Sequence, residues 1–125
     1  MKARVDNKAF GKVLEQRTRD FAVRIFKLSM QLPNTPEAKV VRTQISKSGS
    51  SVGANYREAN RARSKADFRS RTKICESEAS ETQYWLEVIV KCDWIPWEKV
   101  KPDYDECSEI LAIFTSINNR RTSKT

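Results

Sequence analysis

Apolar residues recur along this chain at steps of three and four residues, the spacing of one face of an α-helix. The pattern predicts four helices separated by short polar or proline-containing connections. Their expected ranges are 8–32, 36–61, 65–92 and 103–118. Short connections between long helices favour antiparallel neighbours. We therefore expect an all-α, antiparallel up-down-up-down four-helix bundle, with residues 1–125 forming a single domain.

The same periodicity predicts which side chains face the core of the bundle. The expected inward residues are Leu14, Phe21, Ile25, Leu28 and Leu32; Val41, Ile45, Ser48 or Gly49, Val52, Tyr56 and Ala59; Phe68, Cys75, Ala79, Leu86 and Ile89; and Cys107, Ile110, Leu111, Phe114 and Ile117.

Local signals mark where helices begin and end. Thr35 precedes Pro36 and suits the N-cap of the second helix, since proline is favoured at the first helical position. Ser64 suits the N-cap of the third helix, with Asp67 at the capping-box position. Residues 94–97 are expected to connect the third and fourth helices. Residues 119–125 are expected to form a frayed basic tail.

Gly49 and Gly53 lie inside the second predicted helix. Glycine in a helix interior costs about 1 kcal/mol relative to alanine. Their spacing therefore indicates that the missing side chains make room for a neighbour. The alternative is a kink or break within residues 46–51.

Composition narrows the class of protein. The chain is 38% hydrophobic and 32% charged, with only 3 glycines and 4 prolines in 125 residues, which disfavours an all-β or loop-rich fold. No apolar run approaches the roughly 20 residues of a membrane span, and no signal peptide opens the sequence. We expect a cytoplasmic protein.

Cysteine and histidine usage argues against a metal site. The sequence has no histidine, and Cys75, Cys92 and Cys107 are too widely spaced for a CxxC pair. Zinc, iron–sulfur and disulfide frameworks are therefore disfavoured. We expect all three cysteines to be buried small hydrophobes.

Candidate catalytic carboxylates are few. Glu58, Glu78 and Glu81 are the obvious acids, but histidine, the commonest general base, is absent. No P-loop, nucleophile elbow or dinucleotide fingerprint occurs. We interpret these glutamates, with Asn55, as structural polar residues. We expect neither enzyme activity nor a cofactor, metal or small-molecule substrate.

Charge is distributed unevenly along the chain. Residues 1–73 carry 18 basic and 6 acidic side chains, a net charge of +12, whereas residues 74–109 carry a net −7. The remaining residues restore the total of +8. Such asymmetry predicts separate positive and negative surfaces if the fold keeps these segments apart.

A dense basic run spans the end of the second helix and the start of the third. Its members are Arg57, Arg61, Arg63, Lys65, Arg69, Arg71 and Lys73, and we expect Lys12, Arg19, Arg24, Arg120 and Arg121 to extend it. Arginine predominates, and its planar guanidinium binds phosphate through two hydrogen bonds. The run predicts a surface for RNA or single-stranded nucleic acid that reads the backbone rather than the bases.

The stretch from residue 47 to residue 90 also carries a series of spaced motifs. After the small residues Ser48, Gly49 and Ser51 they read Gly53-Ala54-Asn55, Glu58, Ser64, Asp67-Phe68, Glu78, Glu81-Thr82 and Tyr84-Trp85-Leu86. In this order they resemble small four-helix-bundle proteins first met as products of intervening sequences in bacterial large-subunit ribosomal RNA genes. The resemblance implies subunits that assemble into a pentameric ring. It also implies a possible partner, because relatives are accessory proteins of reverse transcriptases in diversity-generating retroelements.

Aromatic residues at Tyr84, Trp85, Trp94 and Trp97 have two interpretations. They are either core or interface anchors, which we favour, or base-stacking platforms. We expect Trp85 to reach a small-residue surface on a neighbouring subunit. That surface comprises Ser46, Ser50 and Gly53.

Together these features predict a non-enzymatic, homo-oligomeric accessory scaffold that binds RNA or single-stranded nucleic acid. The alternative is a protein-interaction scaffold whose basic end docks an acidic protein partner.

Overall fold

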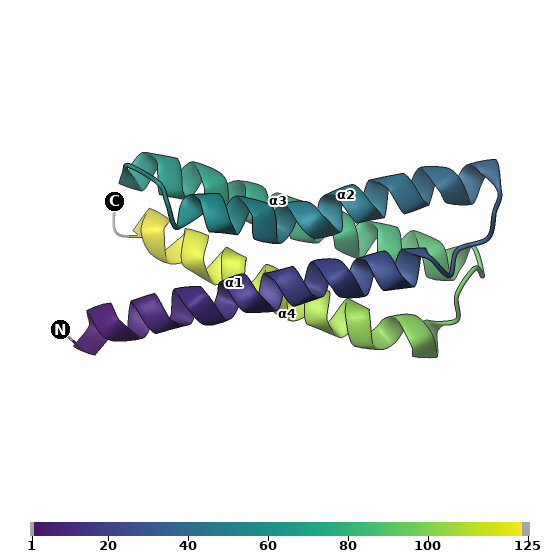
Figure 1. The fold of residues 1–125 in the computed structure, drawn as a ribbon, viewed down its shortest axis with the longest axis horizontal. Coiled ribbons are helices and arrows are strands. Elements are labelled where there is room, and N and C mark those ends of the chain that lie inside the picture. Colours follow the sequence, from purple (N-terminus) through teal and green to yellow (C-terminus); the bar gives the residue numbers. More distant parts are fainter. Residues whose placement is uncertain (1, 124–125) are drawn as a thin grey trace.

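The computed structural model describes residues 2–123, with side chains for residues 8–120. It contains four helices: α1 (Lys2–Ser29), α2 (Pro36–Ala59), α3 (Lys65–Lys91) and α4 (Trp97–Ser123). No strand occurs within residues 2–123, so the all-α, four-helix prediction is confirmed. The α2–α3 turn lies at the same end as the first and last helical residues, and the other two connections lie at the opposite end (Figure 1).

The largest errors in helix boundaries concern α1 and α4. Helix α1 starts at Lys2 rather than at residue 8 and ends at Ser29 rather than at residue 32. Helix α4 starts at Trp97 rather than at residue 103, with Pro102 inside it. Ile95 and Val100 are buried, so the start of α4 packs against the core. Residues 119–123 of the predicted tail are helical, because α4 continues through Ser123, whereas residues 124 and 125 lie outside the described residues.

Both predicted N-caps are confirmed. The Thr35 hydroxyl accepts a hydrogen bond from the Ala38 amide at 3.1 Å, with Pro36 at the first helical position. The Ser64 hydroxyl accepts one from the Asp67 amide at 3.0 Å. Each bond satisfies one of the free N–H groups that every helix start exposes.

The core follows the predicted inward faces closely. Every expected residue is buried except Phe68 and Leu111, which are partly buried and pack against the core. Tyr56 of α2 meets Phe114 of α4 edge to face, with ring centroids 5.4 Å apart. Ser48 and Gly49, which the sequence offered as alternatives for one inward position, are both buried, so the buried face of α2 is wide there.

Helix α2 is continuous through residues 46–51, so the predicted alternative of a break there is wrong. A Cβ on Gly49 would lie 2.8 Å from the Ile25 Cγ2 atom. A Cβ on Gly53 would lie 3.0 Å from the Thr18 Oγ1 atom and 3.2 Å from its carbonyl carbon. The glycines therefore do make room for a neighbour, and that neighbour is α1 of the same chain.

Two of the three cysteines match the prediction. Cys75 and Cys107 are buried, donate to the carbonyl oxygens of Val52 and Ala79, and have pKa values that burial raises to about 12. Cys92 is exposed, so its predicted burial is wrong. It is the C-cap of α3, where the chain turns away from the core.

Side-chain hydrogen bonds join α3 to its neighbours. Thr82 donates to Ser48 of α2 at 2.8 Å. On the α4 side, Thr72 donates to the Asn118 amide oxygen at 2.8 Å, and the Asn118 amide donates to Glu76 at 2.7 Å. These buried polar groups satisfy one another and fix the alignment of the helices. None of the helices described by the structure is long and apolar enough to cross a membrane.

Candidate nucleic-acid interface

The predicted basic run folds into one end of the bundle. We call it the basic turn, and it comprises Arg57, Arg61, Arg63, Lys65, Arg69, Arg71 and Lys73. Its residues come from the last turn of α2, the connection to α3, and the first turns of α3. The local chain reversal brings them together at the end that also holds the first and last helical residues (Figure 1).

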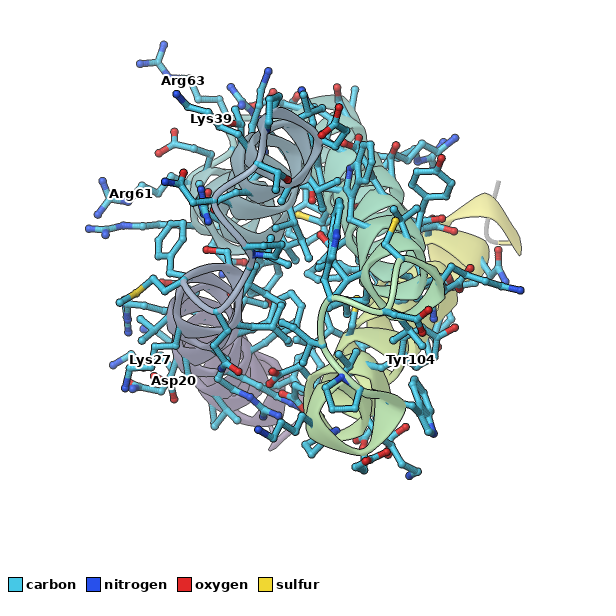
Figure 2. The ribbon with its side chains drawn as sticks, turned by 90° about the vertical axis from the view of Figure 1, so that its right-hand side faces the viewer. Asp20, Lys27, Lys39, Arg61, Arg63 and Tyr104 are labelled. Atoms are coloured by element: carbon cyan, nitrogen blue, oxygen red, sulfur yellow. The ribbon has the colours of Figure 1, made fainter. Side chains whose placement is uncertain are left out.

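Most cations of the basic turn lack a partner among the side chains that the structure describes. Arg57, Arg61, Arg63, Lys65 and Lys73 are exposed, and their side chains make no hydrogen bond or ion pair among the described residues. Arg61 and Arg63 extend outward into solvent, whereas Tyr104 lies on the opposite, α4 side of the molecule (Figure 2). Their donors are free to bind an anionic ligand.

Arg71 differs from these exposed cations because it forms a hydrogen bond within the fold. It is half-buried, and its Nη1 atom donates to the Asn55 amide oxygen at 3.3 Å. Asn55 in turn donates to the Ser51 carbonyl at 2.9 Å. Asn55 therefore links α2 to the basic turn, consistent with its prediction as a structural polar residue.

The residues expected to extend the basic surface differ in exposure and in whether they have a partner. Lys12 and Arg120 are exposed. Arg24 does not contribute, because its Nε atom lies 2.7 Å from the Asp103 Oδ1 atom and its Nη2 atom donates to the Pro102 carbonyl. The expectation for Arg24 is wrong. Arg121 lies outside the residues whose side chains the structure describes.

Arg19 belongs to a shallow groove between α1 and α2. The groove has a volume of about 190 Å³ and is lined by Glu15, Thr18, Arg19, Ala22, Ser50, Gly53, Ala54 and Arg57. Small residues form much of its surface, and Arg19 and Arg57 supply its positive charge. The Glu15 carboxylate is occupied, because it accepts a hydrogen bond from the Asn60 amide at 2.7 Å.

The predicted subunit-contact residues are only partly brought together within one chain. Ser50 and Gly53 share the groove. Ser46 is not among its lining residues, and its hydroxyl lies 3.5 Å from the Ser29 hydroxyl of α1. Trp85 is on α3, so its contact with this surface stays a prediction about a second copy. Since Gly53 also lets α1 approach, replacing it with leucine would disturb the subunit itself.

The glutamates predicted to be structural are not members of any described ion pair. Glu58 and Glu81 are exposed, and Glu81 accepts a hydrogen bond from the Trp85 indole at 3.1 Å. Burial, and then the nearby Glu81 charge, raises the pKa of Glu78. Among the described residues no group of three or more cysteine or carboxylate side chains could hold a metal ion.

Sequence reasoning missed the ion pairs that join α1 to α4. Arg17 of α1 binds Glu106 of α4 through its Nε and Nη2 atoms, at 2.7 and 2.8 Å, and also binds Glu109 at 2.9 Å. The guanidinium lowers the pKa of Glu106. No local spacing signals this contact, because its partners lie far apart in the sequence.

Comparison with known protein families identifies the family of this chain. The sequence pattern of the 23S rRNA-intervening sequence protein family matches residues 13–116. The chain belongs to this family. The match extends beyond the motif-bearing stretch and spans parts of all four helices, so the predicted resemblance is confirmed.

A solved relative agrees with this assignment to the 23S rRNA-intervening sequence protein family. The chain is similar to a protein with unknown function from the S23 ribosomal protein family of Bacteroides thetaiotaomicron VPI-5482, known from a crystal structure. The two are 38% identical over 87% of this chain and 97% of that chain, with a TM-score of 0.80. No functionally curated protein matches the chain.

Proposed function

We propose that this protein is a non-enzymatic accessory scaffold that binds RNA or single-stranded nucleic acid through the basic turn. The observation that carries the proposal is the set of exposed cations at one end of the bundle that have no partner among the described residues. Guanidinium groups favour phosphate, and a polynucleotide offers phosphates at regular intervals. Contacts of this kind give salt-sensitive affinity with little dependence on base sequence.

The proposal includes assembly and location. The subunit is an antiparallel up-down-up-down bundle that forms a ring-like homo-oligomer in the cytoplasm, with five subunits by family resemblance. A ring repeats the basic turn around its axis, so one nucleic acid engages several subunits and gains avidity. A reverse transcriptase of a diversity-generating retroelement is the partner enzyme for which the scaffold would hold RNA.

The test is RNA binding as a function of salt. Fluorescence anisotropy would follow a short labelled single-stranded RNA with the wild type and with the Arg61→Glu/Arg63→Glu/Lys65→Glu variant. We expect the wild type to bind at low salt and release at high salt. Each lost phosphate contact should reduce the slope of log affinity against log salt by about 0.7. The triple variant should therefore bind far more weakly and with a shallower slope.

A matched control separates the basic turn from overall charge. Lys27, Lys39 and Lys99 are exposed and lie near the connections at the opposite end of the bundle. Reversing them to glutamate changes the net charge equally and should leave most of the affinity. Equal losses in both variants would contradict a localised site. Absence of RNA binding at every salt concentration would contradict the proposal and favour a scaffold that docks an acidic protein.

A further inference from the structure

An exposed ridge on α3 combines aromatic and acidic side chains. Tyr84 is 55% exposed and meets Trp85 edge to face, with ring centroids 4.8 Å apart. The Trp85 indole donates to the Oε2 atom of Glu81 at 3.1 Å, which holds that carboxylate beside the rings. We define Glu81, Tyr84 and Trp85 as the α3 ridge.

The α3 ridge has no ion-pair partner within residues 8–120. Glu81 forms none of the ion pairs found among the described residues, and its second carboxylate oxygen accepts no hydrogen bond there. The sequence from residue 74 to residue 90 contains four glutamates and no lysine or arginine. Exposed Tyr84 and partly buried Trp85 therefore lie beside the Glu81 carboxylate, a combination that suits a cationic, apolar partner surface.

The α1–α2 groove has the complementary properties. Small side chains at Ala22, Ser50 and Ala54 leave space that a side chain from another molecule can fill. Among the residues that the structure describes, Arg57 has no partner and Arg19 has a 3.3 Å hydrogen bond to exposed Gln16 alone. At about 190 Å³ the groove is smaller than pockets for drug-sized ligands, which span about 300–1,000 Å³.

Exposed apolar residues continue the groove along α1. Val23 is 46% exposed and Phe26 is 43% exposed. Val23 follows Arg19 by one helical turn, and Phe26 follows Ala22 in the same way. A partner seated in the groove can therefore bury apolar area as well as satisfy the two arginines, which is the composition of an interface core with a charged rim.

We infer that the α3 ridge of one copy docks in the α1–α2 groove of a second copy, with Glu81 facing Arg57. This inference rests on the proposed homo-oligomer and names the surfaces that meet. Ridge and groove are different surfaces of one chain, so the contact is head-to-tail, the type that closes rings. Arg57 is then a contact between subunits, and phosphate binding falls to the rest of the basic turn.

Charge reversal with rescue tests the pairing. Sedimentation equilibrium would give the self-association constant of the wild type, Arg57→Glu, Glu81→Arg and the double variant. Like charges placed across an interface are strongly unfavourable. We therefore expect each single variant to weaken association about tenfold or more. The double variant, which restores opposite charges in exchanged positions, should recover most of that loss.

Matched controls keep the result specific. Glu58→Arg and Arg63→Glu make the same charge changes at exposed residues outside the ridge and the groove, and should leave association near the wild-type level. Tyr84→Ala should weaken association, whereas Trp97→Ala, at another exposed aromatic, should not. Circular dichroism would confirm equal helix content in every variant.

The outcomes separate this inference from the proposed function. Wild-type oligomers that tolerate both single reversals would overturn the inference and leave a homo-oligomer with another interface. Weakening without rescue in the double variant would overturn the Glu81–Arg57 pairing. A wild type that stays monomeric at all concentrations would overturn the proposed homo-oligomer and this contact with it. The RNA-binding triple variant should still associate normally, because it leaves both surfaces intact.

Discussion

Arginines occupy two contrasting environments in this molecule. Along the α1–α4 seam, Arg17 and Arg24 each bind carboxylates of α4 at 2.7 Å. At the basic turn, Arg61 and Arg63 are exposed and have no partner among the described residues. The first pair joins two helices, and the second is available to a ligand. Arginine content therefore does not measure binding capacity, because the fold uses some of these charges internally.

The contrast also changes the interpretation of the acidic segment. Residues 74–109 carry a net −7, but three of their carboxylates, on Asp103, Glu106 and Glu109, are paired with arginines of α1. The separation of charge in the sequence is consequently sharper than the separation on the folded surface.

The largest expected difference between the two environments is in stability. Arg17→Glu places a third negative charge beside Glu106 and Glu109, and should reduce the free energy of unfolding by about 2–3 kcal/mol. Arg63→Glu makes the same charge change at the basic turn and should stay within about 0.5 kcal/mol of the wild type. Urea unfolding followed by circular dichroism measures both. Similar losses of unfolding free energy in the two variants would show that the paired and the exposed arginines do not differ in their contribution to stability.

A pH series tests the Arg17–Glu106 ion pair between α1 and α4, where we expect a change in stability of intermediate size. Hydrogen bonding to Arg17 lowers the pKa of Glu106 in the folded state. A lowered pKa contributes stability that is complete above the ordinary glutamate pKa and is lost as pH falls through the lowered value. We expect the stability difference between the wild type and Glu106→Gln, about 1–2 kcal/mol at pH 7, to shrink in acid.

Urea unfolding from pH 7 to pH 3 measures this difference directly. The Glu58→Gln variant serves as the control, since Glu58 is exposed and forms no ion pair within residues 8–120. It should follow the wild type at every pH. A Glu106→Gln variant that keeps a constant difference across the series would show that the ion pair does not cause the acid sensitivity.

The smallest expected effect lies between the two environments, at Arg71. Its hydrogen bond to Asn55 is 3.3 Å long and its side chain is only half-buried. Asn55→Ala should therefore cost about 0.5–1 kcal/mol of stability and reduce RNA affinity only modestly, because Arg71 loses orientation but keeps its charge. Urea unfolding and RNA anisotropy measure the two effects. A loss of stability as large as that of Arg17→Glu would show that Asn55 stabilises the fold as strongly as the α1–α4 ion pairs do.

Local features of the fold follow from the sequence for clear reasons. The period of apolar residues predicts the inward faces, and hydroxyl residues at Thr35 and Ser64 predict the helix starts, because both depend on neighbours a few positions away. The basic turn is equally predictable. Its residues lie on both sides of one short connection, so any chain reversal there brings them together.

The start of α4 and the exposure of Cys92 were not predictable in the same way. Pro102 signals a helix boundary, yet burial of Val100 extends the helix before it. Cys92 continues an apolar-looking segment, but it falls where the chain leaves α3. In both cases packing against residues distant in the sequence decides the outcome.

The sequence by itself determined the number of helices, their buried faces, their caps and the position of the basic turn, all of which depend on short-range spacing. Tertiary structure alone decided which arginines are paired, because Arg17 and Glu106 meet only when α1 packs beside α4. It also decided that Gly49 and Gly53 admit α1, and that residues of α1 and α2 together form the groove. These contacts depend on the alignment of whole helices, which local spacing does not encode.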